Sequence, residues 1–127
     1  MGRPELIASG FFFCNGKEEN KRIVTEYLVQ RWTKTSSPDP RRLREMVIRD
    51  GYDVFEWADR PNTVYAMHSH SDEQSHWIIS GRLELTIESV GTFALEAGDR
   101  DFMPPETRHS ARVVGEQEVR YLIGSKK

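Results

Sequence analysis

Three of the chain's four histidines, His68, His70 and His76, lie close together, and His109 follows a segment rich in glycine and proline. Histidine is the commonest metal-ligating side chain. Residues 64–67 lead into the first pair without a helix cap or breaker, which is typical of a strand, and residues two apart on a strand share a face. Side by side, two imidazoles can bind one ion about 2.0–2.1 Å from each ligating nitrogen. The spacing therefore predicts a metal site.

The segment that follows predicts a turn and a second strand. Residues 71–73 are polar and typical of a turn, and residues 74–80 form a strand that ends at Gly81. Alternation places two sets on opposite faces: Gln74, His76 and Ile78 on one, and Ser75, Trp77 and Ile79 on the other. If Gln74 faces inward, His76 points into the same space.

Two motifs of this chain resemble those of the cupin family. The first motif opens with a turn residue, here Asn62, and continues with an H-x-H pair, here His68 and His70. A further ligand, Gln74, and a closing glycine, Gly81, complete it. The second has a glycine, a proline turn and a histidine, here Gly98, Pro104 to Glu106, and His109. The motifs cover residues 62–109, and the surrounding strands extend the resemblance to about 50–127. It implies an all-β fold, a cupin-type jelly-roll β-barrel (a double-stranded β-helix) with its ligands inside one mouth.

The resemblance implies a metal shell of four residues, His68, His70, Gln74 and His109. Cupins usually carry glutamate where this chain has Gln74, so the shell has one carboxylate fewer and the ion keeps one more unit of positive charge. Glu73 is one position away, but its use would break both flanking spacings. Asn62 and Glu106 stand where the motifs usually have glycine, and asparagine tolerates the left-handed backbone region.

One divalent transition metal ion is implied, with zinc, iron, manganese, nickel and copper as candidates. Three imidazoles and an amide leave coordination positions open, as a catalytic metal needs. His76 would then be a catalytic acid or base, or a polar lining residue bonded to backbone or water. Two classes of function follow. One is an enzyme of dioxygenase, isomerase or lyase type that acts on a small oxygenated metabolite, and the other is a non-catalytic small-molecule-binding or sensor barrel.

The composition bounds the partners and the compartment. A length of 127 residues predicts one domain. The 18 basic and 20 acidic residues give a net charge of −2, which offers no reason to expect a nucleic-acid or membrane partner. The N-terminus lacks the pattern of a secretory signal. A single cysteine, Cys14, excludes an internal disulfide and predicts a reducing, cytoplasmic location.

Residues 1–50 predict a helical extension packed on the barrel, with one or two N-terminal α-helices. Lys17–Trp32 carries an apolar stripe with helical spacing. Arg41–Arg49 predicts a second helix, because Ser37-Pro38-Asp39-Pro40 supplies an N-cap and a proline at the first position, and Gly51 follows its end. The linker between the two helices contains two prolines and is too long for a helix-turn-helix, so we expect no DNA binding.

Residues 51–127 predict the barrel itself, as many short strands separated by turn signals. Leu83, Leu85 and Ile87 alternate with polar residues, which indicates a strand with one wet face. Near the N-terminus, Phe11–Phe13 lies between glycines and predicts either packing on the barrel or a contact between copies. Since cupins resemble one another in forming homodimers, the resemblance implies a homodimer.

Overall fold

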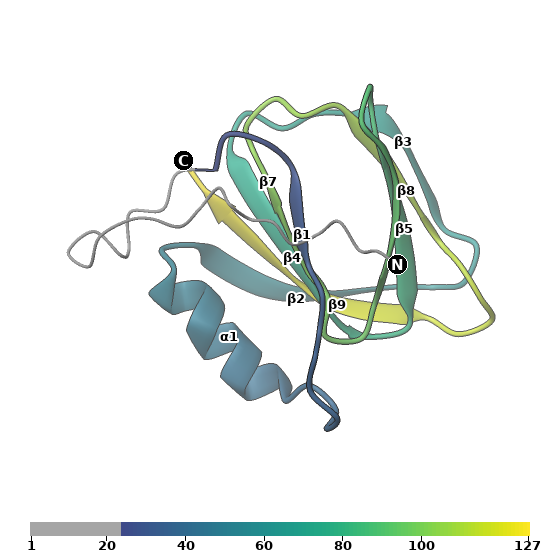
Figure 1. The fold of residues 1–127 in the computed structure, drawn as a ribbon. Helices are drawn as coiled ribbons and strands as arrows, with labels where there is room; N and C mark the ends of the chain where they lie inside the picture. Colours follow the sequence, from purple (N-terminus) through teal and green to yellow (C-terminus); the bar gives the residue numbers. More distant parts are fainter. Residues whose placement is uncertain (1–23) are drawn as a thin grey trace.

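The computed structural model describes residues 24–127, which form two antiparallel β-sheets and one helix (Figure 1). The elements, in chain order, are β1 (Leu28–Gln30), α1 (Pro40–Arg49), β2 (Asp53–Asp59), β3 (Val64–His68), β4 (Glu73–Ser80), β5 (Arg82–Ile87), β6 (Gly91–Glu96), β7 (Arg100–Met103), β8 (His109–Val113) and β9 (Val119–Lys126). One sheet has the order β1-β7-β4-β9-β2 and the other the order β3-β8-β5-β6. The expected all-β jelly roll with an N-terminal helix is confirmed.

The strand β4 shows why the two sheets enclose a core. Ile78 is fully buried between the sheets with Leu83 and Leu85 of β5, whereas Trp77 and Ile79 pack on the outer face of the five-stranded sheet. This is the alternation that the sequence predicts for residues 74–80. Each face of this sheet therefore has its own apolar layer, one inside the barrel and one beneath α1.

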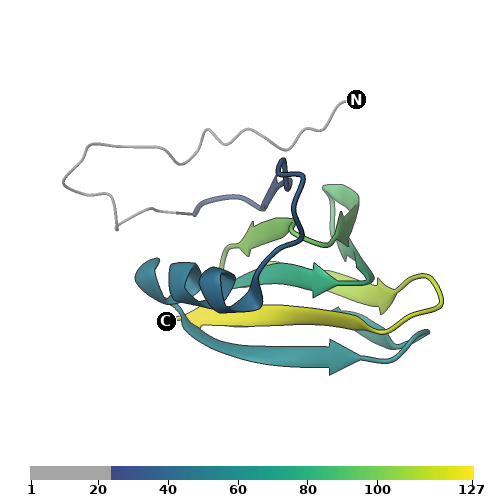
Figure 2. The same ribbon diagram turned by 90° about the horizontal axis from the view of Figure 1, so that it is seen from below.

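The helix α1 forms where its end signals lie. The Asp39 carboxylate accepts a hydrogen bond from the Arg41 amide at 3.1 Å, Pro40 opens the first turn, and Gly51 follows with φ +98°. Leu43 and Val47 are buried against the sheet, and Figure 2 shows α1 lying along β2 and β9. The predicted second helix is confirmed.

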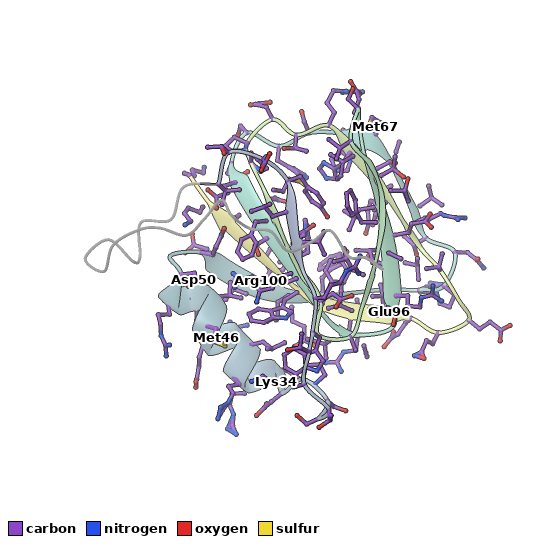
Figure 3. The ribbon with its side chains drawn as sticks, viewed as in Figure 1. Lys34, Met46, Asp50, Met67, Glu96 and Arg100 are labelled. Atoms are coloured by element: carbon purple, nitrogen blue, oxygen red, sulfur yellow. The ribbon has the colours of Figure 1, made fainter. Side chains whose placement is uncertain are left out.

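The buried Arg100 of β7 lies between α1 and the sheet. Its guanidinium is 4.5 Å from the ring centroid of Trp77 and 4.4 Å from that of Phe102. Nη1 donates at 2.9 Å to Oδ2 of Asp50, the residue directly after α1 (Figure 3). Nε donates to Ser75 Oγ at 2.9 Å. The end of the helix is thus tied to the sheet by a charged hydrogen bond.

The helix expected over Lys17–Trp32 is wrong in its described part. Residues 28–30 form the strand β1, which pairs with β7 in the register Leu28 to Phe102. Val29 enters the barrel core while Leu28 packs with the outer layer, so the apolar residues serve both faces of a strand rather than one stripe of a helix. Phe11–Phe13, Cys14 and the first part of this segment lie outside the described residues.

No helix in residues 24–127 has the length and apolarity needed to cross a membrane. The division at residue 51 into an extension and a barrel stays a prediction.

Candidate metal centre

A cavity of about 320 Å³ lies inside the barrel and is lined by residues of both sheets. His68, His70, Gln74, His76 and His109 all line it, so the structure brings every sequence-predicted site residue to one space. Its other walls are mostly aromatic and aliphatic. In the part of the chain that the structure describes, no Asp, Glu, Lys or Arg lines this cavity.

Three of the histidines converge. The ring centroid of His68 is 4.3 Å from that of His109 and 4.8 Å from that of His70, and His70 and His109 are 5.2 Å apart. One ring nitrogen from each can be chosen so that all three lie within 4.8 Å of one another. Nitrogens that are each about 2.0–2.1 Å from a common ion lie no more than about 4.2 Å apart, so the three rings must move closer together to bind one.

Backbone carbonyls fix which nitrogen of two rings is available. His68 Nδ1 lies 2.6 Å from the Ala66 carbonyl oxygen, and His109 Nδ1 lies 2.9 Å from that of Thr107. A carbonyl oxygen can only accept a hydrogen bond, so both Nδ1 atoms carry the proton and donate. The Nε2 lone pairs are left for a metal, an arrangement that metal-ligating histidines commonly show. These residues therefore fit a metal ion.

A β-bulge directs His68 into the cavity. Tyr65 pairs with Ala111 and His68 with His109, so β3 has one residue more than β8 over the same interval. In a regular strand, residues three positions apart such as Tyr65 and His68 face opposite sides, yet both line the cavity. His70 lies two residues beyond the end of β3, so the expectation that both histidines share one strand is wrong.

A left-handed turn holds the loop that carries His70. Glu106 has φ +65°, and its amide donates to the His70 carbonyl oxygen at 2.7 Å. Asn62 has φ +70°. Both residues stand where the family motifs usually have glycine, and both adopt the backbone conformation that glycine favours.

Gln74 and Glu73 face opposite sides of β4. Gln74 lines the cavity, whereas the Glu73 carboxylate accepts a hydrogen bond from the Tyr52 hydroxyl and lies 3.9 Å from Lys126 Nζ. The carboxylate next to Gln74 in the sequence is therefore bonded on the other side of the sheet. Gln74 is the residue of this pair placed to ligate an ion, as the motif spacing predicts.

The imidazoles of His70 and His109 are held neutral. Burial lowers the pKa of His109 to about 4, against the hydrogen bond to Thr107, which raises it, and with the other three imidazoles lowering it further. Burial, then His68 and His76, lower the pKa of His70. Neutral imidazole is the form that binds metals, so the site is preorganised for one.

His76 belongs to a buried polar group that the sequence does not reveal. Its Nδ1 lies 2.9 Å from Asp101 Oδ1, its backbone amide donates to the same atom at 2.7 Å, and the Tyr27 hydroxyl donates to Oδ2 at 2.8 Å. Burial lowers the pKa of His76, but the charge of Asp101 and its hydrogen bond outweigh burial and raise it overall. With Nδ1 committed to Asp101, Nε2 is free toward the cavity.

A second carboxylate orders the aromatic wall. Asp59 Oδ1 accepts hydrogen bonds from Trp57 Nε1 at 3.1 Å and from the Tyr65 hydroxyl at 2.6 Å, and Oδ2 accepts from the Tyr121 hydroxyl at 2.8 Å. All three rings line the cavity. Nothing in the sequence pointed to this shared acceptor.

Fold and site together define a jelly-roll barrel with a candidate histidine metal centre. The cupin domain model matches residues 55–124, more than half of the chain, and the chain belongs to the cupin family. No sequence among the curated proteins matches it.

Solved structures resemble the chain in fold. A DMSP lyase from Ruegeria pomeroyi is 21% identical over 60% of this chain, with a TM-score of 0.55, and the match spans 38% of the lyase. A cupin protein from Bacteroides fragilis is 24% identical over 61% of this chain and 66% of its own, with a TM-score of 0.51. A DUF861 family protein from Thermotoga maritima is 19% identical over 77% and 97%, with a TM-score of 0.50. At these identities the likeness shows the fold alone.

Proposed function

We propose that this chain is a metal-dependent enzyme of the dioxygenase, isomerase or lyase type, which acts on a small oxygenated metabolite. The observation that carries the proposal is the convergence of His68, His70 and His109 at one end of a cavity large enough for a ligand. Gln74 completes the proposed shell. A divalent transition metal ion bound there supplies Lewis acidity or a site for dioxygen.

His76 is the proposed acid or base. Its Nε2 faces the cavity, and Asp101 holds the ring in one tautomer and one orientation through Nδ1. Asp101 also stabilises the protonated ring, so His76 can accept a proton from a bound substrate and return it. Asp101 and Tyr27 act on the substrate only through His76 and are positioning residues.

A second candidate is a non-catalytic barrel that binds a small molecule through its metal ion. The neutral shell favours it, because no carboxylate among the described residues lines the cavity to activate a substrate. We further propose a cytoplasmic location, from the single cysteine, and a homodimer, from the family.

The first experiment is elemental analysis of tag-free protein purified without an immobilised-metal column. We expect close to one transition metal ion per chain, with its identity narrowing the chemistry. His68→Ala and His109→Ala should each lose the ion while circular dichroism still reports a folded barrel, and His76→Ala should keep it. Full metal content in both ligand variants would sink the proposed shell.

A further inference from the structure

Four aromatic side chains line the cavity on the side of β2, β3 and β9: Phe55, Trp57, Tyr65 and Tyr121. Phe55 and Trp57 lie two residues apart on β2 and meet edge to face, with ring centroids 6.1 Å apart and planes at 89°. They are 49% and 47% exposed although they line a cavity, so much of their surface is free for a ligand.

The polar atoms of this wall are already used. The indole N–H of Trp57 and the hydroxyls of Tyr65 and Tyr121 all donate to the buried Asp59. Three rings are therefore fixed in orientation by one acceptor, and their faces and edges, rather than their hydrogen-bonding groups, remain for contact. Rings held in this way lose little conformational freedom when a ligand binds.

Beside Tyr65 in the four-stranded sheet the wall is aliphatic, with Leu83, Leu85 and Ala111 of β5 and β8. No Asp, Glu, Lys or Arg among residues 24–127 lines the cavity, so a charged group on this part of a ligand would have no ionic partner there. The uncharged polar groups that line it and are not bonded to Asp59 are instead the three clustered histidines, Gln74, His76 and Ser125. The cavity thus has one polar end and an aromatic body.

We propose that the ligand is a flat aromatic molecule whose oxygen donors reach the proposed metal centre and whose uncharged ring lies against Phe55, Trp57 and Tyr65. This inference rests on the proposed metal site and adds the substrate class. The cavity volume of about 320 Å³ is near the lower end for ligand pockets and fits one substituted ring. Offset or edge-to-face contacts between aromatic rings stabilise a complex beyond the area they bury.

The test compares two probes of similar size with the same head group, benzohydroxamic acid and cyclohexanecarbohydroxamic acid. Their binding to the metal-loaded protein is measured by isothermal titration calorimetry. Burial alone favours the saturated ring at least as much as the aromatic one. We expect the aromatic probe to bind about threefold to tenfold more tightly.

The double variant Phe55→Leu with Trp57→Leu should lower the ratio of the two affinities by about threefold to tenfold. The ring attached to the shared hydroxamate group alters its own metal affinity, and this difference cancels when the ratio in the variant is compared with that in the native chain. Both side chains are half exposed, so the variant is expected to fold, and Val64→Ala on the outer face of β3 is the control that leaves the ratio unchanged. Equal affinities in the native chain, or an unchanged ratio in the double variant, would overturn the inference.

Metal content measured on the same samples separates the two proposals. If the protein holds its ion and does not prefer the aromatic probe, the metal site stands and the aromatic ligand is excluded. If it holds no ion, the proposed function fails. The aromatic wall is then tested by itself, by comparing the protein NMR chemical-shift changes that phenol and cyclohexanol cause. Preferential shifts of the Trp57 indole N–H with phenol support the wall, and equal shifts reject it.

Discussion

Gln74 is the member of the proposed shell with the least charge to offer. It faces the cavity from β4, while its neighbour Glu73 is bonded to Tyr52 on the other side. The amide oxygen is a neutral ligand, so the shell of three imidazoles and one amide leaves the full charge of the ion uncompensated.

Gln74→Glu should therefore tighten divalent metal binding by at least about tenfold, because even in water two unit charges 4 Å apart attract by about 1 kcal/mol and the ion carries two. Competition against a fluorescent chelator measures the affinity. Gln74→Ala serves as the matched variant and should weaken it. If neither change alters the affinity, Gln74 does not ligate the ion.

Glu106 is a strained residue beside the site. A non-glycine residue in the left-handed region costs about 1–2 kcal/mol relative to its favoured conformations. Glycine removes this cost, but it also raises the conformational entropy of the unfolded chain, which offsets part of the gain. Glu106→Gly should raise the free energy of unfolding by about 0.5–1 kcal/mol in urea titrations. Asn62→Gly is the comparison, with a change close to zero because asparagine tolerates this region. A loss of stability in Glu106→Gly would show that its side chain contributes more than its backbone costs.

Among the elements, α1 is held by both apolar and charged contacts. Arg100→Ala removes the ring contacts with Trp77 and Phe102 and leaves Asp50 without this partner. We expect a loss of about 3 kcal/mol or more in the free energy of unfolding, as for other broken buried pairs. Arg82→Ala, in an exposed pair with Glu96, should change it by less than about 0.5 kcal/mol. Similar effects of the two changes would contradict a special role for Arg100.

The strands that could be predicted from the sequence are those with an unambiguous local pattern. In β4 the alternation of Gln74, His76 and Ile78 with their neighbours places each side chain correctly, because a period of two has one structural solution. The segment of β1 fits a helical stripe equally well, and only its pairing with β7 decides for a strand. Local spacing carries no information on a partner so far along the chain.

The same reasoning explains what the candidate site gained from the structure. His68, His70 and Gln74 follow from the spacing within one short motif, and His109 follows from the spacing within a second. Asp101 reaches His76 from 25 positions away, and Asp59 reaches Tyr121 from 62 positions away. These carboxylates have no local sequence signature, so their partners become visible only in the folded chain.

At the scale of the whole molecule, residues 24–31 connect the N-terminal segment to the barrel through apolar contacts and hydrogen bonds. Val24 and Val29 are buried in the two apolar layers, and Tyr27 and Arg31 bond to Asp101 and Asp99. A chain lacking residues 1–34 loses all of these contacts. A chain lacking residues 1–22 keeps them.

We therefore expect the longer deletion to unfold at a lower temperature than the shorter one, or to aggregate, as followed by calorimetry. Light scattering of the same samples tests the homodimer. A dimer that becomes a monomer on removal of residues 1–22 would place the contact at or near Phe11–Phe13, and a dimer that persists would place it on the barrel. Equal stability of both deletions would contradict the contribution of β1.

The bulge in β3 makes the count of residues between Tyr65 and His68 part of the design of the site. Tyr65 belongs to the wall proposed to recognise the ligand and His68 to the centre proposed to hold the metal, and the bulge is what lets these residues, three positions apart, act on one side. Evolution can exchange the side chains at positions 66 and 67 and keep this geometry. Loss of one residue would leave Tyr65 and His68 two positions apart on a regular strand, again on one face, whereas a further residue would need a second irregularity in β3, so this short interval should tolerate substitution best and insertion least.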